Sequence, residues 1–169
     1  IADGDDLLAA TVDAVADLAN SYLFVQGPPG AGKTYTTAHA IVELIRRGKK
    51  VGVAANSRTV IHNLLAVIEK MANERIVAYD GVRKSSAVNP ESAYNGTYIR
   101  SEDKSENISL SASLLAGTAW LFAHERFDQH LDYLFIDEAG QVSVANVIAM
   151  GVAASNIVLV GDQMQLGQP

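Results

Sequence analysis

The segment GPPGAGKT, residues 27–34, constrains the fold of this chain more than any other part of its sequence. It follows an apolar stretch of strand character, residues 21–26, and opens a stretch of helical periodicity, residues 33–47. Its glycines let backbone N–H groups turn inward around a phosphate, and the start of the following helix adds a partial positive charge. Lys33 is placed to reach the terminal phosphates of a nucleotide, and the Thr34 hydroxyl to ligate magnesium. The spacing therefore predicts a phosphate-binding loop between a strand and a helix.

The rest of the chain alternates between helix-like and strand-like segments. Apolar spacing predicts helices at residues 5–19, 33–47, 58–72 and 143–154, and strands at 21–26, 50–55, 75–79, 114–120, 132–136 and 156–161. Short apolar strands that alternate with helices are typical of an α/β fold with a parallel sheet covered by helices on both faces. Ligands in such a fold bind at the carboxyl ends of the strands, so we expect the phosphate loop at that edge.

Residues 80–112 break this alternation, because they are rich in Gly, Pro, Ser, Asn and charged residues and show little periodicity. They are predicted to form a polar insertion or an exposed excursion. The remaining length fits one domain over residues 1–169. No helix follows the last predicted strand, so we expect this domain to be a fragment of a longer polypeptide.

Composition excludes several classes of protein. An apolar content of 49% is enough for a core, and no apolar run approaches the roughly 20 residues that span a bilayer, so no membrane partner is expected. The absence of cysteine excludes disulfide scaffolds and thiolate metal sites and fits a cytoplasmic, intracellular protein, as does the acidic N-terminus, where a signal peptide would be basic. The four histidines lack the spacing of paired metal ligands. A net charge of −6 argues against binding of nucleic acid through a broad basic surface, although a local groove could bind it.

Two adjacent acids, Asp137 and Glu138, end the apolar strand in DYLFIDEAGQ, residues 132–141. Neighbouring side chains of a strand point to opposite faces, so these acids are not expected to form one solvated patch. A phosphate-loop site needs a carboxylate for its magnesium at the end of a neighbouring strand, and Asp137 fits that position. Hydrolysis also needs a group that deprotonates the attacking water. Glu138 is therefore predicted to be the catalytic base of an ATPase, the alternative being an exposed acid at a helix start.

Polar residues also follow the last predicted strand, in VGDQMQL, residues 160–166. Asp162 and Gln165 are the candidates for reaching the γ-phosphate of a nucleotide. An ordinary polar turn is the alternative for this segment.

Five stretches together resemble, in order, the motifs of superfamily 1 helicases, in the branch of the nonsense-mediated decay helicase and its DNA-processing relatives. They are QGPPGAGKT (26–34, motif I), AANSRTVIHNLL (54–65, motif Ia), AGTAW (116–120, motif Ic), FIDEAGQ (135–141, motif II) and VLVGDQMQL (158–166, motif III). GTAWLFA, DEAGQVSVANVIAMG and GDQMQL also resemble a bacterial group in which such a helicase follows a RecB-like nuclease domain. The resemblance covers residues 21–79 and 114–169 and leaves out 80–113.

The resemblance implies a RecA-like P-loop NTPase domain that uses ATP and Mg²⁺ and acts on single-stranded nucleic acid, with DNA favoured over RNA. It implies nucleotide binding by Gln26, Gly27, Pro28, Pro29, Gly30, Ala31, Gly32, Lys33, Thr34 and Tyr35. Thr34 and Asp137 would hold the magnesium, while Lys33, Glu138 and Gln165 would serve catalysis, Gln165 by sensing the γ-phosphate. Ser57, Arg58 and Thr118 would contact the nucleic-acid strand.

Three departures from the family pattern matter. The glutamine that reads adenine would lie near residue 10, where LLAATVDAV has none. The residue before Ser57 is Asn56, where the family usually has proline. Motifs IV to VI are absent; they belong to a second RecA-like domain whose arginine fingers accelerate hydrolysis by roughly a thousandfold or more. We therefore expect this domain to work with a second RecA-like domain in the same longer chain and to be nearly inactive without it.

Other readings of these residues stay open. The chain could be a nucleotide-gated switch or assembly ATPase without strand movement, or a P-loop kinase, although no arginine-bearing lid is found. Basic and aromatic residues are interleaved within residues 80–112 and could stack on bases, but nearby acids favour a solvated loop or a small accessory subdomain. Trp120 and Phe122 are predicted to be core residues rather than a platform for stacking bases.

Overall fold

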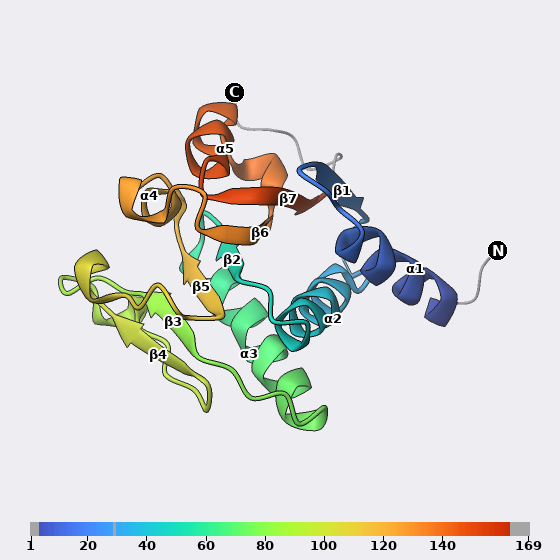
Figure 1. Ribbon diagram of the computed structural model, residues 1–169, viewed down its shortest axis with the longest axis horizontal. Coiled ribbons are helices and arrows are strands. Elements are labelled where there is room, and N and C mark those ends of the chain that lie inside the picture. The colour runs from blue at the N-terminus through green and yellow to red at the C-terminus, as the bar shows by residue number, and fades with distance from the viewer. Residues whose placement is uncertain (1–3, 29, 163–169) are drawn as a thin grey trace.

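A seven-stranded sheet, with the strands in the order β1-β7-β6-β2-β5-β3-β4, organises the chain (Figure 1). The computed structural model describes residues 4–28 and 30–162, with side chains from residue 7 onward. The strands are β1 (Tyr22–Gln26), β2 (Val51–Ala54), β3 (Gly81–Lys84), β4 (Ile99–Glu102), β5 (Leu114–Gly117), β6 (Leu131–Ile136) and β7 (Ala154–Gly161). The α-helices are α1 (Gly4–Ala16), α2 (Lys33–Arg46), α3 (Arg58–Glu74), α4 (Ala119–Phe122) and α5 (Val144–Gly151). All the paired strands run parallel, which confirms the predicted α/β fold with a parallel sheet.

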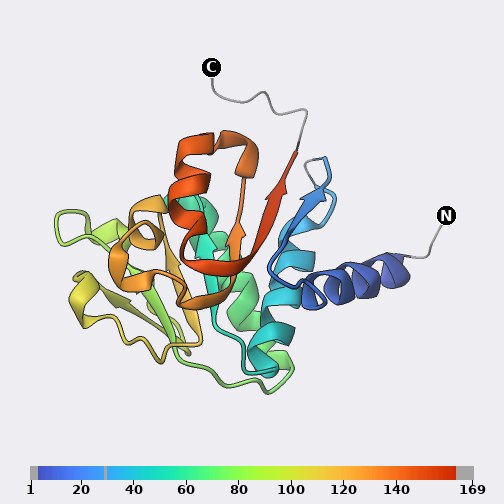
Figure 2. The same cartoon turned by 45° about the horizontal axis from the view of Figure 1, so that its top comes forward.

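Different helices cover the two faces of the sheet, with α1 to α3 (blue to green) on one side and α4 and α5 (orange) on the other (Figures 1 and 2). The central strand β6 contributes to the hydrophobic cores on both faces of the sheet. Its residues Tyr133 and Phe135 belong to the core beneath α1 to α3, and Leu134 and Ile136 belong to the core beneath α4 and α5. A strand buried on both faces needs a continuous apolar run rather than an alternating one. None of the helices in the described part of the chain is long and apolar enough to cross a membrane.

The strand predicted at residues 75–79 is wrong. The chain turns there instead, because the Val77 N–H donates to the Ala72 carbonyl at the end of α3, and Ile76 has a φ of 56° and is 91% exposed. The strand that follows α3 is β3, whose sequence GVRK gives no apolar signal. Its Arg83 is nevertheless only 2% exposed, so a buried charge hid this strand from the hydrophobic pattern.

The strand predicted at residues 114–120 is too long. β5 ends at Gly117, and Thr118 has extended backbone angles and begins α4. This short helix carries Trp120 and Phe122 in different directions: Phe122 is fully buried, as predicted, and Trp120 is 88% exposed. The prediction of Trp120 as a core residue is therefore wrong, because the residue lies on a helix surface and not in a buried strand.

Residues 80–112 are more ordered than predicted, since β3 and β4 lie within them and extend the main sheet. Polar contacts with α3 fix this segment. The Glu69 carboxylate on α3 is 8% exposed and accepts hydrogen bonds from the Tyr94 hydroxyl (3.1 Å) and the Tyr98 N–H (2.8 Å). Gly96 leaves room for it, because a Cβ there would lie 1.8 Å from a Glu69 carboxylate oxygen. Such contacts are invisible to an analysis of apolar periodicity.

Glu69→Ala is expected to lower the free energy of unfolding by about 2–3 kcal/mol, because it removes two hydrogen bonds to a charged acceptor and leaves the Tyr98 N–H without its partner. Urea unfolding followed by circular dichroism measures this. Glu74→Ala on the same helix is the matched control, since Glu74 forms an exposed ion pair of 4.0 Å with Lys70, and a change below about 0.5 kcal/mol is expected. Equal effects of the two substitutions would contradict the proposed role of Glu69.

Candidate nucleotide-binding site

The phosphate loop lies where the sequence predicts it, between the end of β1 and the start of α2. Gly30 and Gly32 have φ values of 79° and 77°, a left-handed conformation in which a side chain is strained. Gly32 is the N-cap of α2, so the free N–H groups of that helix face the loop. The Gly27 N–H donates to the Gly161 carbonyl at the end of β7 (3.3 Å), which ties the loop to the carboxyl edge of the sheet. Pro29, predicted as a nucleotide contact, lies outside the described residues.

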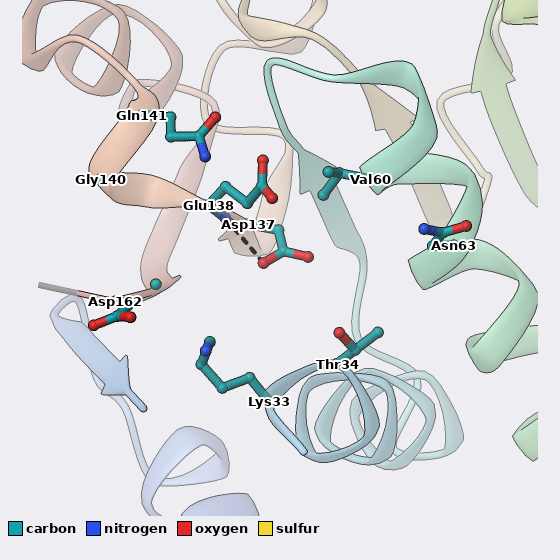
Figure 3. A pocket seen from close by; sticks show the side chains of 10 residues that line it. Lys33, Thr34, Val60, Asn63, Asp137, Glu138, Gly140, Gln141 and Asp162 are labelled. Atoms are coloured by element: carbon teal, nitrogen blue, oxygen red, sulfur yellow. Dashed lines mark hydrogen bonds between the residues drawn. The ribbon is translucent and has the colours of Figure 1, made fainter. Parts of the chain in front are cut away.

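A pocket of about 240 Å³ opens above this loop (Figure 3). Four segments line it: the start of α2, the residues after β6, the end of β7 and the first turns of α3. The lining residues are Lys33, Thr34, Val60, Asn63, Asp137, Glu138, Gly140, Gln141, Gly161 and Asp162. The pocket thus brings together five residues that the sequence singled out, Lys33, Thr34, Asp137, Glu138 and Asp162. The fold gathers them because β1, β7 and β6 are neighbours and end at the same edge of the sheet. β7 lies between β1, which leads into the phosphate loop, and β6, which leads into Asp137 and Glu138.

Asp137 and Glu138 face the same pocket, and the rule of opposite faces does not apply to them, because β6 already ends at Ile136. The Asp137 N–H donates to the Ala54 carbonyl (2.8 Å), which fixes the residue beside β2. Glu138 has a φ of 51°, an uncommon conformation for a residue other than glycine. Its own N–H donates to the Asp137 carboxylate (2.9 Å). This left-handed turn brings the second acid back over the first, as Figure 3 shows.

Burial raises the pKa of both carboxyl groups. For Asp137 the Glu138 N–H and the Lys33 charge partly oppose this rise in pKa. For Glu138 the neighbouring Asp137 charge adds to the rise in pKa. A raised pKa makes Glu138 a better proton acceptor than an ordinary glutamate. Burial and the Asp137 charge both disfavour the charged form of Glu138, and a divalent cation nearby would favour it.

The residues present fit magnesium. The Thr34 hydroxyl and the Asp137 carboxylate are hard oxygen ligands, and both point into the pocket (Figure 3). Residues 4–28 and 30–162 hold no cluster of three or more His, Cys, Asp or Glu side chains that could enclose a metal. Magnesium usually shares one or two protein oxygens with the phosphates of its nucleotide instead of occupying a cage of protein ligands. The pocket is therefore suited to magnesium that arrives with a nucleotide.

The other predicted nucleotide contacts surround the loop. The Lys33 ammonium donates to the carbonyls of Gly27 and Pro28, so it lies across the mouth of the phosphate loop. Gln26 is the last residue of β1. Tyr35 is 54% exposed and lines a second hollow beside the loop, whose apolar wall is formed by Val67 and Met71.

The predicted nucleic-acid contacts lie farther along the same edge of the sheet. Ser57 is the N-cap of α3 and Thr118 the N-cap of α4, and neither side chain caps its helix. They follow β2 and β5, which are adjacent and end in register. Arg58 and Thr118 line a separate pocket, not the one above the phosphate loop.

Sequence reasoning missed three polar residues near the site. Asn63 and Gln141 line the pocket, and the Asn56 side-chain amide donates to the Gln141 carbonyl (2.6 Å). That bond joins the loop after β2 to the segment after β6. This hydrogen bond could have been predicted if β2 and β6 were known to be adjacent. The sequence predicts a parallel sheet but not the order of its strands. Gln165, the predicted γ-phosphate sensor, lies outside the described residues.

Comparisons with known proteins relate the chain to a family and to several longer proteins. The family model described as "AAA domain" matches residues 9–168. The DNA replication ATP-dependent helicase/nuclease JHS1 of Arabidopsis thaliana is 32% identical over 88% of this chain and 11% of its own length. The DNA replication ATP-dependent helicase/nuclease DNA2 of Saccharomyces cerevisiae is 26% identical over 88% of the chain and 10% of its own length. The RecBCD enzyme subunit RecD of Buchnera aphidicola is 24% identical over 90% of the chain.

These curated relatives are much longer than the chain, which spans 11%, 10% and 24% of their lengths. Among solved structures, an arterivirus nonstructural protein 10 (helicase) in complex with DNA has a TM-score of 0.56 at 15% identity, covering 92% of this chain and 32% of its own. The SWI2/SNF2 ATPase core of Sulfolobus solfataricus in complex with double-stranded DNA has a TM-score of 0.60 at 12% identity, covering 97% and 31%. At such low identity these two likenesses establish the shared fold.

Proposed function

The chain belongs to the AAA domain family and is a RecA-like domain of the superfamily 1 helicase type, and we propose that it is the ATP-hydrolysing motor domain of a DNA helicase or translocase. The observation that carries this proposal is the convergence of Lys33, Thr34, Asp137 and Glu138 on one pocket at the N-terminus of α2. A kinase would need room for the hydroxyl group of a second substrate, which accepts the phosphoryl group. Here a second carboxylate occupies the position beside the metal ligand, which suits activation of water.

The chemistry follows from where each group lies. The N-terminus of α2 and the Lys33 ammonium would bind the β- and γ-phosphates, while Thr34 and Asp137 would hold magnesium, which neutralises charge on those phosphates when bound. Glu138 would orient a water molecule toward the γ-phosphorus and accept its proton. The bond from the γ-phosphorus to the β–γ bridging oxygen breaks as the new P–O bond forms, and ADP and inorganic phosphate result. Gln165 is proposed to sense the γ-phosphate.

The strand would lie along the other half of the same edge. Ser57, Arg58 and Thr118 are proposed to contact it, through hydroxyl and guanidinium groups that need little net positive charge from the chain. DNA is favoured over RNA because the names of the JHS1 and DNA2 relatives describe DNA replication helicases. The Asn56 to Gln141 hydrogen bond supports coupling between the two halves, since it links the loop before Ser57 to the segment that carries Glu138.

Lys33→Ala is expected to weaken strongly the binding of a fluorescent ATP analogue in the presence of magnesium, because Lys33 is the only cation among the described residues that line the pocket. Losing a charge-assisted contact to phosphate weakens binding by roughly a hundredfold. Lys49→Ala is the matched control, because Lys49 is exposed and precedes β2. The binding curve of this variant should overlay that of the unmodified chain. Unchanged binding in Lys33→Ala would show that the phosphate-loop assignment is wrong.

A further inference from the structure

The pocket lined by Arg58 and Thr118, of about 530 Å³, lies at the carboxyl edge of the sheet away from the phosphate loop. It is bounded by the start of α3, the end of β3 with the loop that follows, and the start of α4. We call it the edge pocket. Its lining includes Arg58, Arg83, Lys84, Thr118 and Trp120, and the other residues that line it carry no charge.

The charge of the edge pocket contrasts with that of the chain. The chain as a whole has a formal net charge of −6, yet three cations and no carboxylate line this pocket among the described residues. Arg58 forms an ion pair of 3.8 Å with Glu91, whose side chain is 86% exposed. The Lys84 ammonium bonds to backbone carbonyls of Ser85 and Asp103, not to carboxylates. Among the described residues the edge pocket is therefore a local cationic site, in which Arg83 and Lys84 have no carboxylate partner and Arg58 has only an exposed one.

Arg83 shows that this charge is built into the fold. The residue is 2% exposed, and its guanidinium donates to the carbonyls of Lys84 and Ala116. Its Nε is buried and has no hydrogen-bond partner among the described residues, and the same holds for Nη1 of Arg58. Burial and the Arg58 charge lower the pKa of Arg83 to about 10, so the Arg83 guanidinium remains charged at neutral pH and is repelled by the Arg58 charge. An anion between them would satisfy both donors and remove that repulsion.

Trp120 adds an aromatic surface to the same pocket. Its side chain is 88% exposed on α4, while Phe122, two residues later, is fully buried. An exposed indole beside guanidinium groups offers a stacking face next to an anion site. A ligand that carries both an anionic group and a flat ring would use both, and a nucleotide of a single strand has this combination.

We propose that the edge pocket binds one nucleotide of the single strand, with its phosphate between Arg58 and Arg83 and its base stacked on Trp120. This inference rests on the proposed function, because it takes the strand to be the motor's track. It adds Arg83, Lys84 and Trp120 to the contacts expected of Ser57, Arg58 and Thr118. Stacking on an aromatic ring accepts any base, so the pocket would hold the strand without reading its sequence.

The fluorescence of Trp120 tests the proposal directly, because it is the only tryptophan of the 169-residue chain. Titration with an oligothymidylate should quench this fluorescence, and an oligonucleotide of the same length with abasic sites should bind without quenching it. By anisotropy of a labelled oligothymidylate, Trp120→Ala should bind about tenfold more weakly and Trp120→Phe should recover most of the loss. Tyr22→Ala, which removes another exposed aromatic ring, should leave the affinity unchanged.

The cationic part has its own readout. Arg58→Gln should lower the slope of log K against log salt concentration by about 1, because one phosphate contact is lost. Arg46→Gln, an exposed arginine at the far end of α2, should leave this slope unchanged. Oligonucleotide binding without quenching, and with equal affinity of Trp120→Ala, would overturn the inference and leave the proposed function intact. No oligonucleotide binding at all, with ATP binding still dependent on Lys33, would overturn both the inference and the strand-moving part of the proposed function.

Discussion

Glu138→Gln is expected to reduce ATP hydrolysis by about two to four orders of magnitude while ATP binding stays close to that of the unmodified chain. The amide keeps the size of the side chain and the left-handed turn at this position, but it cannot accept a proton from water. Lys33, Thr34 and Asp137 remain in place to bind the nucleotide and its magnesium. Phosphate release under single-turnover conditions measures the rate, and binding of a fluorescent ATP analogue measures the affinity.

The matched control is Glu125→Gln, which makes the same chemical change at an acid that does not line the pocket. It should hydrolyse ATP at the rate of the unmodified chain. If Glu138→Gln also kept that rate, Glu138 would be a structural acid at the start of the short helix Ala139–Gln141. Another group would then have to activate the water.

The pH dependence of hydrolysis should carry the same signature. Burial and the Asp137 charge raise the pKa of Glu138 above its ordinary value, and the base acts only in its deprotonated form. Activity is therefore expected to fall, as the pH is lowered, at a higher pH than an ordinary glutamate would require. In Glu138→Gln the residual activity should no longer show this fall at low pH, because the titrating carboxyl group has been removed. An acid limb at the ordinary glutamate position would contradict the burial of the carboxylate.

The residues of the phosphate loop and the acids could be predicted because each is set by local chemistry. Gly30 and Gly32 adopt left-handed angles within one short loop, and Asp137 follows directly from the apolar run of β6. Fixed spacing along the chain is enough to recognise such features. Their meeting in one pocket also follows from the parallel sheet, because the carboxyl ends of parallel strands share an edge.

The parts that could not be predicted depend on contacts distant in sequence. β3 and β4 were hidden because Arg83 and the partners of Glu69 replace the apolar pattern with specific polar bonds. Trp120 was assigned to the core because its neighbours are apolar, but Gly117 ends the strand and the next turn carries the indole outward. The hydrophobicity of a segment indicates that it can be buried. Which of its residues are buried depends on the tertiary packing. Polar residues buried by specific partners are thus where sequence analysis failed here, and one of them, Arg83, lines the proposed strand site.

Joining this domain to a second RecA-like domain of the superfamily 1 type, which we propose as its partner, is expected to raise ATP turnover by about a thousandfold or more. Lys33 is the only cation among the described residues that line the nucleotide pocket, so this domain alone supplies little positive charge to the γ-phosphoryl group as it is transferred. The resemblance to superfamily 1 helicases implies that arginine fingers would come from that second domain. Steady-state turnover of the single domain and of the two-domain protein, at equal magnesium concentration, gives the ratio. Similar rates for the two proteins would mean that this pocket is complete by itself.

The same two-domain protein separates a motor from a switch, because only a motor couples hydrolysis to a strand. If the edge of the sheet binds the strand as proposed, single-stranded DNA should stimulate turnover more than single-stranded RNA does. The stimulation should be weakened in Trp120→Ala, whose nucleotide pocket is unchanged. Fast hydrolysis that neither strand affects would instead favour a nucleotide-gated switch or assembly ATPase, and Ser57, Arg58 and Thr118 would lose their proposed roles. Stimulation by RNA alone would keep the motor and change its track, because guanidinium contacts to phosphate and stacking on an indole do not distinguish the two sugars.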